Sequence, residues 1–197
     1  CGESRFIGRP CTLVRLTGCH LRCVWCDSEH SFQGGRHLSV DEILAEVRGN
    51  GFETVLVTGG EPLLRPDIFE IARYGSDKGL RMVMAPNGTL ITEDKARQMA
   101  DAGIQRISIS LDGATREIHD RFRGVDGAFD GALQGIAMAK KAGVEFQINT
   151  TITKSNLDQI PAIQELAVNL GAVAHHIFLL VPTGRGKYIV DTEIDAL

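Results

Sequence analysis

Segments rich in β-branched residues alternate with segments of helical periodicity along the whole sequence. Six segments are predicted strands: residues 12–17, 54–58, 81–85, 106–111, 145–153 and 176–181. Several are near-continuous apolar runs, which is typical of parallel strands buried on both faces. Strict alternation with helices predicts an α/β fold with a parallel sheet. Right-handed crossovers would curl six such units into a (β/α)6 partial TIM barrel, because a closed barrel needs eight.

The sequence also marks where helices begin and end. Ser39 and Glu42 form a capping box ahead of an apolar stripe, and Thr92 is suited to cap a later helix. Helices are expected to follow residues 39, 66, 92 and 156, with another through Phe129 that ends near 143. The segment 111–127 is polar and rich in charge, so we expect it to be a mobile loop.

Length and composition set the class of protein. At 197 residues, with 43% hydrophobic and 23% charged residues, the chain resembles a soluble globular protein of one domain. The net charge of −4 and the lack of a Lys/Arg cluster argue against nucleic-acid binding. No apolar run reaches the roughly 18 residues of a membrane span. We therefore expect neither nucleic acid nor membrane as partners, and the sequence leaves the oligomeric state open.

The cysteines are crowded at one end of the chain. The five positions are Cys1, Cys11, Cys19, Cys23 and Cys26. An odd and crowded set argues against a disulfide framework and favours a reducing, cytoplasmic compartment. We interpret Cys1 and Cys11 as free, partly buried thiols, since cysteine is among the most buried residue types.

Three of these cysteines form a motif. Cys19, Cys23 and Cys26 lie at i, i+4 and i+7, shortly after the first predicted strand. A structural zinc site is usually closed by four protein ligands, and a cubane iron–sulfur cluster normally has four thiolates. Three close thiolates therefore indicate a cluster with one iron left open for a ligand that is not protein. A Cys3His zinc site that recruits His20 or His30 is the alternative.

The loop after the second predicted strand reads Gly59-Gly60-Glu61-Pro62. Two glycines let the backbone approach a ligand closely where a side chain would block it. Glu61 can then accept a charge-assisted hydrogen bond from an ammonium group. The carboxyl ends of parallel strands carry the chemistry in such folds, so this loop and the cysteines are expected to face one site.

These two motifs resemble those of the radical S-adenosylmethionine (AdoMet) superfamily. The resemblance implies that the three cysteines bind a [4Fe–4S] cluster whose fourth iron takes the amino and carboxylate groups of AdoMet. Reductive cleavage of AdoMet would give a 5′-deoxyadenosyl radical that abstracts hydrogen from a carboxylate-bearing small molecule. The resemblance also implies an external electron donor such as flavodoxin or ferredoxin, and an enzyme of the lyase or oxidoreductase class.

The same resemblance assigns residues to AdoMet. Trp25 stands where the family places an aromatic beside the adenine, and Arg123 stands where an arginine meets the AdoMet carboxylate. Ser110 and Asn149 resemble positions that contact the ribose and the methionine moiety. The full set of expected AdoMet contacts is Trp25, Gly59, Gly60, Glu61, Pro62, Asn87, Ser110, Arg123 and Asn149.

Residues 1–64 resemble 7-carboxy-7-deazaguanine synthase, the ring-contracting lyase of deazapurine biosynthesis. The carrying residues are Gly2-Glu3-Ser4, Gly8-Arg9-Pro10, Arg15-Leu16-Thr17-Gly18-Cys19 and Trp25-Cys26-Asp27. This resemblance implies that Glu3 and Arg15 contact the substrate, with Arg15 binding its carboxylate. The chain departs from the family at Cys1, where the family has glutamine, and at Ser28, where a threonine contributes to a magnesium site. The serine at position 28 weakens the expectation of Mg²⁺ as a cofactor but does not exclude it, because serine also offers a hydroxyl ligand.

Residues 65–197 resemble instead the radical SAM enzymes of alternative haem biosynthesis, including its decarboxylases, and related peptide-modifying enzymes. The carrying stretches are residues 84–88, 108–113, 119–124 and 179–186. Arg185, flanked by glycines, is a candidate to hold a substrate carboxylate. Those relatives continue into a cysteine-rich extension, whereas no cysteine follows Cys26 here. We therefore expect a single core domain over residues 1–197, truncated at both ends and without an auxiliary cluster.

Three functional hypotheses remain open at this point. The first is a radical SAM enzyme that acts on a deazapurine precursor or a porphyrin. The second is a chain that binds the cluster and AdoMet but turns over only AdoMet. Its substrate pocket would then fit the substrate of neither family, because its two parts resemble different families. The third, of another class, is a zinc-binding module without redox chemistry.

Overall fold

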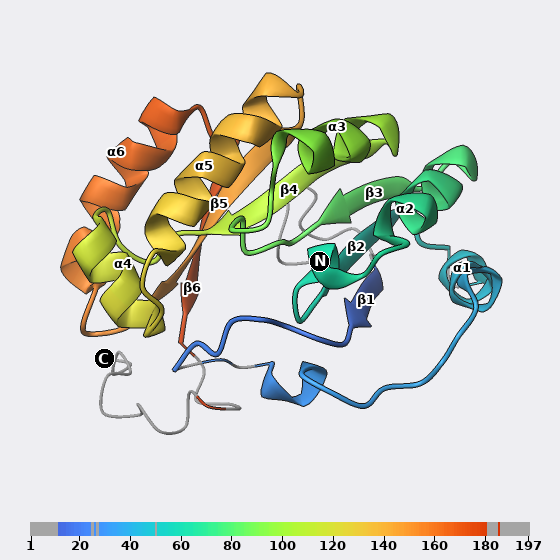
Figure 1. The fold of residues 1–197 in the computed structure, drawn as a ribbon, viewed down its shortest axis with the longest axis horizontal. Helices are drawn as coiled ribbons and strands as arrows, with labels where there is room; N and C mark the ends of the chain where they lie inside the picture. Colours follow the sequence, from blue (N-terminus) through green and yellow to red (C-terminus); the bar gives the residue numbers. More distant parts are fainter. Residues whose placement is uncertain (1–11, 25, 27, 50, 181–184, 186–197) are drawn as a thin grey trace.

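Six parallel strands form one sheet in the order of the sequence (Figure 1). The computed structural model describes residues 12–24, 26, 28–49, 51–180 and 185. The strands are β1 (Thr12–Leu16), β2 (Thr54–Gly59), β3 (Arg81–Met84), β4 (Ile104–Ser110), β5 (Glu145–Ile152) and β6 (His175–Leu179). Each strand pairs in parallel with the next. Within the described residues β1 and β6 are the two edges, so the predicted (β/α)6 partial barrel, curved but unclosed, is confirmed.

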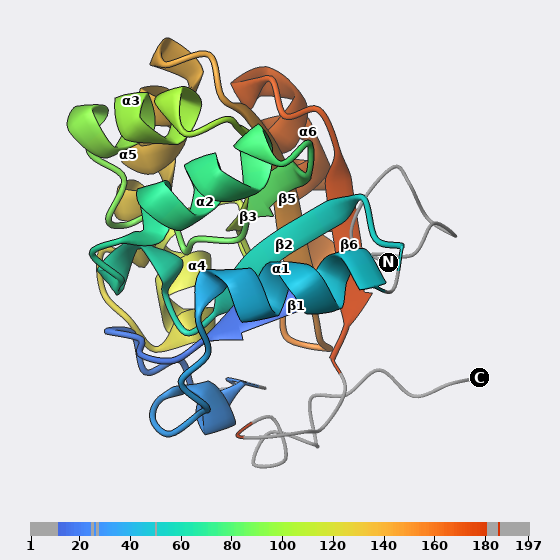
Figure 2. The same cartoon turned by 90° about the vertical axis from the view of Figure 1, so that its right-hand side faces the viewer.

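The helices lie on the outer face of this sheet, as the two ribbon views show (Figures 1 and 2). They are α1 (Val40–Gly49), α2 (Ile68–Asp77), α3 (Glu93–Asp101), α4 (Arg116–Arg123), α5 (Ala128–Lys141) and α6 (Ile160–Leu170). Three short 3-10 turns accompany them: η1 (Glu29–Ser31), η2 (Pro62–Leu64) and η3 (Leu157–Gln159). The capping box is confirmed, because the backbone N–H of Ser39 donates to the Glu42 carboxylate at 2.7 Å. Thr92 caps α3 by accepting from the backbone N–H of Lys95 at 3.2 Å.

The two faces of the strands differ in polarity. In β4, Ile107 and Ile109 are fully buried and belong to the hydrophobic core that the helices cover. Ser108 and Ser110, which alternate with them, line a cavity on the inner face. Successive side chains of a strand point to opposite faces, so this alternation separates an apolar outer layer from a polar interior. The interior of the partial barrel is therefore suited to bind a polar ligand.

The prediction of a mobile loop over residues 111–127 is wrong, because helix α4 lies within this segment. Helix α4 buries His119, Asp120 and Arg123. The Asp120 carboxylate accepts from the backbone N–H groups of Gly127 at 2.7 Å and Phe129 at 2.8 Å, which fastens α4 to the start of α5. The buried face of α4 is polar and satisfied by hydrogen bonds, so it carries no apolar stripe from which the helix could be predicted.

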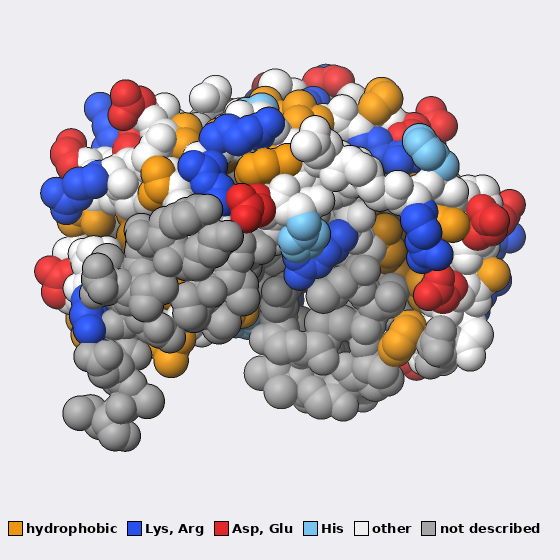
Figure 3. Space-filling view, turned by 90° about the horizontal axis from the view of Figure 1, so that it is seen from below, with side chains coloured by type: hydrophobic (Ala, Val, Ile, Leu, Met, Phe, Trp, Pro, Cys, Tyr) orange, Lys and Arg blue, Asp and Glu red, His pale blue; other side chains and the backbone are white. Residues whose placement is uncertain are grey.

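Two surface properties bear on possible partners. No helix among the described residues has the length and apolarity needed to cross a bilayer. On the face shown in Figure 3, the visible Lys and Arg side chains are interspersed with Asp and Glu side chains. The mixture of charges on this face is in line with the near balance of 21 Lys and Arg residues against 25 Asp and Glu residues in the sequence.

Candidate functional site: a cysteine-lined cavity

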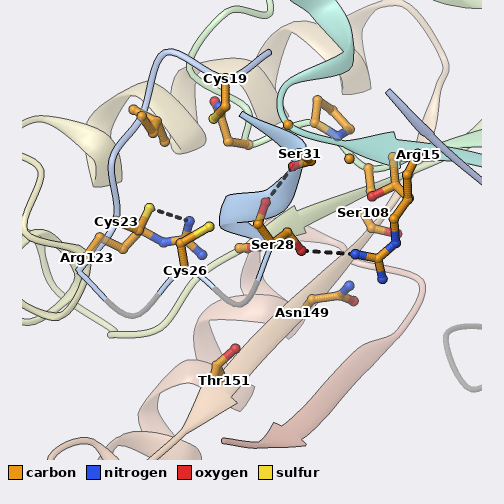
Figure 4. A pocket seen from close by; sticks show the side chains of 18 of the residues that line it. Arg15, Cys19, Cys23, Cys26, Ser28, Ser31, Ser108, Arg123, Asn149 and Thr151 are labelled. Carbon is orange, nitrogen blue, oxygen red and sulfur yellow. Dashed lines mark hydrogen bonds between the residues drawn. The ribbon is translucent and has the colours of Figure 1, made fainter. Parts of the chain in front are cut away.

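A cavity of about 360 Å³ lies at the carboxyl ends of the strands (Figure 4). Its lining comes from the loop after β1, from the ends of β2 to β5, and from β6 and Leu180 beyond it. Ligand sites of parallel α/β folds occupy this edge, and pockets for small ligands begin at roughly 300 Å³. Position and size both favour a binding site.

The three cysteines of the motif meet at this cavity. Cys19, Cys23 and Cys26 are partly exposed thiols that form no disulfide, and all three line its wall (Figure 4). The backbone N–H of Cys26 donates to the Cys23 carbonyl at 3.3 Å, so these two cysteines share one turn. Burial raises the pKa of the Cys19 thiol, and iron would have to displace that proton on binding. Thiolates with an open side toward a cavity fit a cluster that binds an external ligand.

Three other segments hold the cysteine loop by backbone hydrogen bonds. The Gly18 N–H donates to the Ser31 carbonyl at 2.8 Å, which ties the loop to η1. The Gly18 carbonyl accepts from the Glu61 N–H at 2.7 Å, which ties it to the loop after β2. The Val24 N–H donates to the Arg123 carbonyl at 3.1 Å, at the end of α4. The thiols are thus positioned by the fold on three sides.

Gly59 and Gly60 allow this close approach of two backbones. A Cβ on Gly59 would lie 2.2 Å from the Leu16 carbonyl oxygen, and one on Gly60 would lie 1.8 Å from the Gly18 carbonyl oxygen. Gly59 also has φ +121°, a conformation that side chains disfavour. Both glycines line the cavity, as predicted, but the structure adds that they are needed for contact with the cysteine loop itself.

Glu61 is buried behind the cavity and bound by backbone amides. It is 1% exposed, and it is not among the described residues that line the cavity. One carboxylate oxygen accepts from the Leu63 N–H at 3.0 Å, and the other accepts from the Asn87 N–H at 2.7 Å. The side chain therefore joins the loop after β2 to the loop after β3, and its oxygens are directed at backbone amides rather than at an ammonium group in the cavity.

Burial raises the pKa of Glu61 to about 7, although the two backbone N–H groups oppose the shift. Folding then favours the protonated form, so the contribution of Glu61 to stability falls as pH rises from 4.5 to about 7. In wild-type protein the contribution of Glu61 to the free energy of unfolding should fall by about 3 kcal/mol between pH 4.5 and about 7. We expect Glu61→Gln to remove this pH dependence. Urea unfolding of the cluster-free protein at several pH values measures it. Glu70→Gln, an exposed change on α2, is the control; equal pH slopes for wild type and Glu61→Gln would contradict the prediction.

Three further predicted AdoMet contacts reach the cavity. Asn87, Ser110 and Asn149 line it from the ends of β3, β4 and β5. The Asn87 side-chain oxygen accepts from Thr89, while its Nδ2 is buried without a partner among the described residues. An unsatisfied buried donor is costly, so Asn87 Nδ2 fits a site in which a ligand supplies the acceptor. This donor supports the fit of a polar ligand such as AdoMet.

Arg123 also lines the cavity, but its guanidinium already has an acidic partner. Its Nε and Nη2 both donate to one carboxylate oxygen of Asp112, at 2.9 and 2.8 Å. Its Nη1 lies 3.8 Å from the Cys23 sulfur (Figure 4). The expected contact with a free AdoMet carboxylate therefore competes with an ion pair that the protein has already formed.

The other predicted site residues differ in where they lie relative to the cavity. Trp25 and Glu3 lie outside the described residues. Pro62 begins η2 and is buried, and it is not among the described lining residues. Arg15 lines the cavity and donates to the Ser28 hydroxyl at 3.1 Å. Arg185 lies against the cysteine loop, where its backbone N–H donates to the Cys26 carbonyl at 2.8 Å.

Sequence reasoning missed a buried group around Asp112. The Asp112 N–H donates to His119 Nδ1 at 3.0 Å, and the Asp112 carbonyl accepts from Asn156 Nδ2 at 2.9 Å. Thr58, Ser108 and Thr151 line the cavity and were also missed. The signal for these three was available, since each lies on an inward face near the carboxyl end of a predicted strand. No comparable local signal marks Asp112 or Asn156.

Geometry alone does not separate the zinc alternative from the cluster. No three His, Cys, Asp or Glu side chains of the described residues, the three cysteines included, are arranged around a single metal ion. His20, one of the two suggested fourth ligands, has its Nε2 3.0 Å from the Thr89 hydroxyl.

Comparison with known proteins decides the family. The family model described as "Radical SAM superfamily" matches residues 13–167, which is most of the chain. The chain belongs to the radical SAM superfamily. Membership implies a [4Fe–4S] cluster and AdoMet as cofactors. The cysteine loop, Gly59 and Gly60 all lie within the matched residues.

Relatives of this radical SAM protein were found among curated proteins and solved structures. It is 52% identical to the AdoMet-dependent heme synthase of Methanosarcina barkeri, over 86% of this chain and 50% of that protein. It is 37% identical to a probable GTP 3′,8-cyclase of Saccharolobus islandicus, over 91% of this chain and 60% of that protein. A structure of native anSMEcpe with bound AdoMet has the same fold, with a TM-score of 0.70, 22% identity, and coverage of 86% of this chain and 51% of that one.

The alignments refine the expected division of the chain. The chain spans about half the length of the heme synthases it matches. The match to the Methanosarcina barkeri protein covers 86% of this chain, more than residues 65–197 can supply. The likeness to heme synthases therefore extends into the first 64 residues.

Proposed function

We propose that this protein binds a [4Fe–4S] cluster through Cys19, Cys23 and Cys26 and reductively cleaves AdoMet in the cavity beside them. Held by the three cysteines, the cluster would supply the electron for this cleavage, and the cleaved AdoMet would supply the oxidant for hydrogen abstraction from the substrate. The observation that carries the proposal is that three thiols outside any disulfide line one cavity together with the Gly59–Gly60 turn. A flavodoxin or ferredoxin of a reducing cytoplasm is the proposed electron donor.

The residues of the chain position the cofactors. Glu61 and the two glycines hold the loops after β1, β2 and β3 together, which fixes one wall of the cavity. Asn87 Nδ2, a buried donor without a partner among the described residues, is proposed to bind AdoMet. Ser110 and Asn149 lie across the cavity at the ends of β4 and β5 and are proposed as further contacts. Walls contributed by several strands can orient AdoMet against the cluster and exclude water.

For the substrate we propose a carboxylate-bearing tetrapyrrole of the porphyrin class. Support comes from the 52% identity to an AdoMet-dependent heme synthase. Arg15 on the inner face of β1 is the proposed carboxylate ligand, because a guanidinium pairs with a carboxylate by two parallel hydrogen bonds. The polar inner face beside it, formed by Ser108, Asn149 and Thr151, can accommodate further acidic or polar substituents.

A deazapurine precursor with Mg²⁺ is the second candidate, because of the N-terminal resemblance. The contact between Arg15 and the Ser28 hydroxyl disfavours the metal. It places a guanidinium at the hydroxyl that would have to ligate Mg²⁺, and two cations so close repel each other. The porphyrin class is therefore the preferred substrate.

Anaerobic reconstitution with iron and sulfide, followed by AdoMet and dithionite, tests the proposal. We expect about four irons per chain, a brown protein and formation of 5′-deoxyadenosine. Cys23→Ala should reduce 5′-deoxyadenosine formation by at least ~100-fold, because loss of a ligand costs more than the roughly 10- to 100-fold that loss of a residue supporting a ligand costs. Iron content, absorbance and product chromatography are the measurements.

The control and the substrate assay separate the hypotheses. The parallel variant Cys23→Ser keeps a weaker oxygen ligand and should retain part of the cluster. A colourless protein that binds zinc instead would overturn the cluster assignment. With the cluster present, formation of a decarboxylated tetrapyrrole supports the preferred substrate, conversion of a deazapurine precursor supports the second, and AdoMet cleavage alone indicates a mismatched pocket.

A further inference from the structure

Asp112 has no access to the cavity, yet every polar part of it is engaged. Its side chain is 0% exposed. One carboxylate oxygen accepts twice from the Arg123 guanidinium, and the other accepts from the Thr151 N–H at 2.8 Å. Its own N–H and carbonyl are bound by His119 and Asn156. A residue bound through its side chain and backbone by four other residues has a fixed position, so its partner Arg123 is fixed as well.

The guanidinium held in this way reaches one particular cluster ligand. Arg123 Nη1 donates toward the Cys23 sulfur at 3.8 Å, and the carbonyl of the same residue accepts from the Val24 N–H at 3.1 Å. Side chain and backbone of Arg123 thus contact two consecutive residues of the cysteine loop. Gly124 permits the contact, since a Cβ there would lie 2.6 Å from the Val24 side chain.

We propose that Asp112 is a positioning residue that holds the Arg123 guanidinium against the Cys23 sulfur and thereby raises the reduction potential of the cluster. The proposal rests on cluster binding by the three cysteines. An N–H donor and a positive charge at a ligating sulfur stabilise the reduced, more negative form of an iron–sulfur cluster. Asp112 contributes by orientation, because its carboxylate engages Nε and Nη2 and leaves Nη1 to face the sulfur.

The arrangement also explains why the chain maintains a buried ion pair. Side chains of Asp112 and Arg123 are 0% and 8% exposed. A pair in such a place is weak evidence for stability, since removal of two charges from water costs about as much as their attraction returns. A function at the neighbouring sulfur supplies a reason for the pair that stability does not.

The contact can be tested first without a cluster. In protein labelled with ¹⁵N-arginine, the Arg123 side chain should give slowly exchanging N–H resonances, because the ion pair buries it. We expect Asp112→Asn to release these protons to fast exchange and Cys23→Ala to shift the Nη resonance. Resonances that respond to neither substitution would overturn the proposal even if no cluster can be loaded, so this result is independent of the proposed function.

Redox titration of the reconstituted protein, followed by EPR, tests the effect on the cluster. Arg123→Met should shift the midpoint potential to a more negative value, whereas the exposed change Arg121→Gln on the same helix should leave it unchanged. In the Arg123→Met background, Asp112→Asn should cause no further shift, because an unpaired buried Asp112 takes up a proton. If Asp112→Asn shifts the midpoint potential by the same amount in wild-type protein and in Arg123→Met, Asp112 acts without Arg123 and the proposal is overturned.

The proposal stays testable even if one of the single variants fails to fold. Asp112→Asn alone leaves a buried guanidinium unpaired and can destabilise the protein. The double variant Asp112→Asn/Arg123→Met removes both charges and should fold best of the three. In wild-type protein, coupling between the reduced cluster and ¹⁵N of arginine, measured by pulsed EPR, supports the contact without any substitution; its absence in a loaded cluster contradicts it.

Discussion

Gly60→Ala should lower the free energy of unfolding by about 3 kcal/mol and abolish AdoMet-dependent formation of 5′-deoxyadenosine. The added Cβ would lie 1.8 Å from the Gly18 carbonyl oxygen, which is a backbone atom and cannot move aside as a side-chain tip can. Relief of this clash requires separation of the two loops, with loss of the hydrogen bond from the Glu61 N–H to the Gly18 carbonyl. Since Cys19 follows Gly18 directly, its thiolate moves out of register with the other two.

Gly49→Ala is the matched control for this prediction. Gly49 belongs to α1 and has no positive φ, and a Cβ added there would have no atom within 4 Å, so the same methyl group meets open space. Alanine is favoured over glycine by about 1 kcal/mol in a helix interior, so Gly49→Ala at the last residue of α1 should not destabilise the protein. Urea unfolding and the 5′-deoxyadenosine assay are the measurements. Unchanged iron loading and activity in Gly60→Ala would show that the two loops are not held as described.

The protein should lose up to about 5 kcal/mol of stability on acidification because of His119. Burial lowers the pKa of His119 to about 3, with a smaller contribution from the positive charge of Arg123. The unfolded chain binds a proton at His119 below its ordinary pKa of 6.5, whereas the folded chain does not. The stabilisation is therefore complete above pH 6.5 and is lost progressively as pH falls toward 3. Neutral His119 is also required as the acceptor of the Asp112 N–H.

Replacement of the titrating ring isolates this effect. His119→Asn keeps a side-chain oxygen that can accept from Asp112 but cannot be protonated in this pH range. We expect a shallower loss of stability between pH 6.5 and 3 in this variant, measured by urea unfolding of the cluster-free protein. The exposed His37→Asn serves as the comparison and should follow wild type. If His119→Asn has the same acid dependence as wild type, His119 is not the group responsible.

Much of the fold and the outline of the site could be read from the sequence. The six strands and the helices other than α4 were predicted to within a few residues, because apolar periodicity directly reports which face of each element is buried. Ser39, Glu42 and Thr92 cap their helices through partners within three residues, so local sequence was sufficient there. The cysteine loop and the Gly59–Gly60 turn follow strands, and parallel strands bring their carboxyl ends to one edge.

The roles of polar residues were decided only by the tertiary structure. Cys23 and Arg123 are 100 residues apart in sequence, and Asp112 and Thr151 are 39 apart. Glu61 was expected to face a ligand, but the fold places the Asn87 and Leu63 amides at its carboxylate. Helix α4 was missed because its buried face consists of ion-paired and hydrogen-bonded side chains. Apolar burial follows a local pattern, whereas burial of a charge is tolerated only when distant segments supply its partners, and no local pattern encodes those partners.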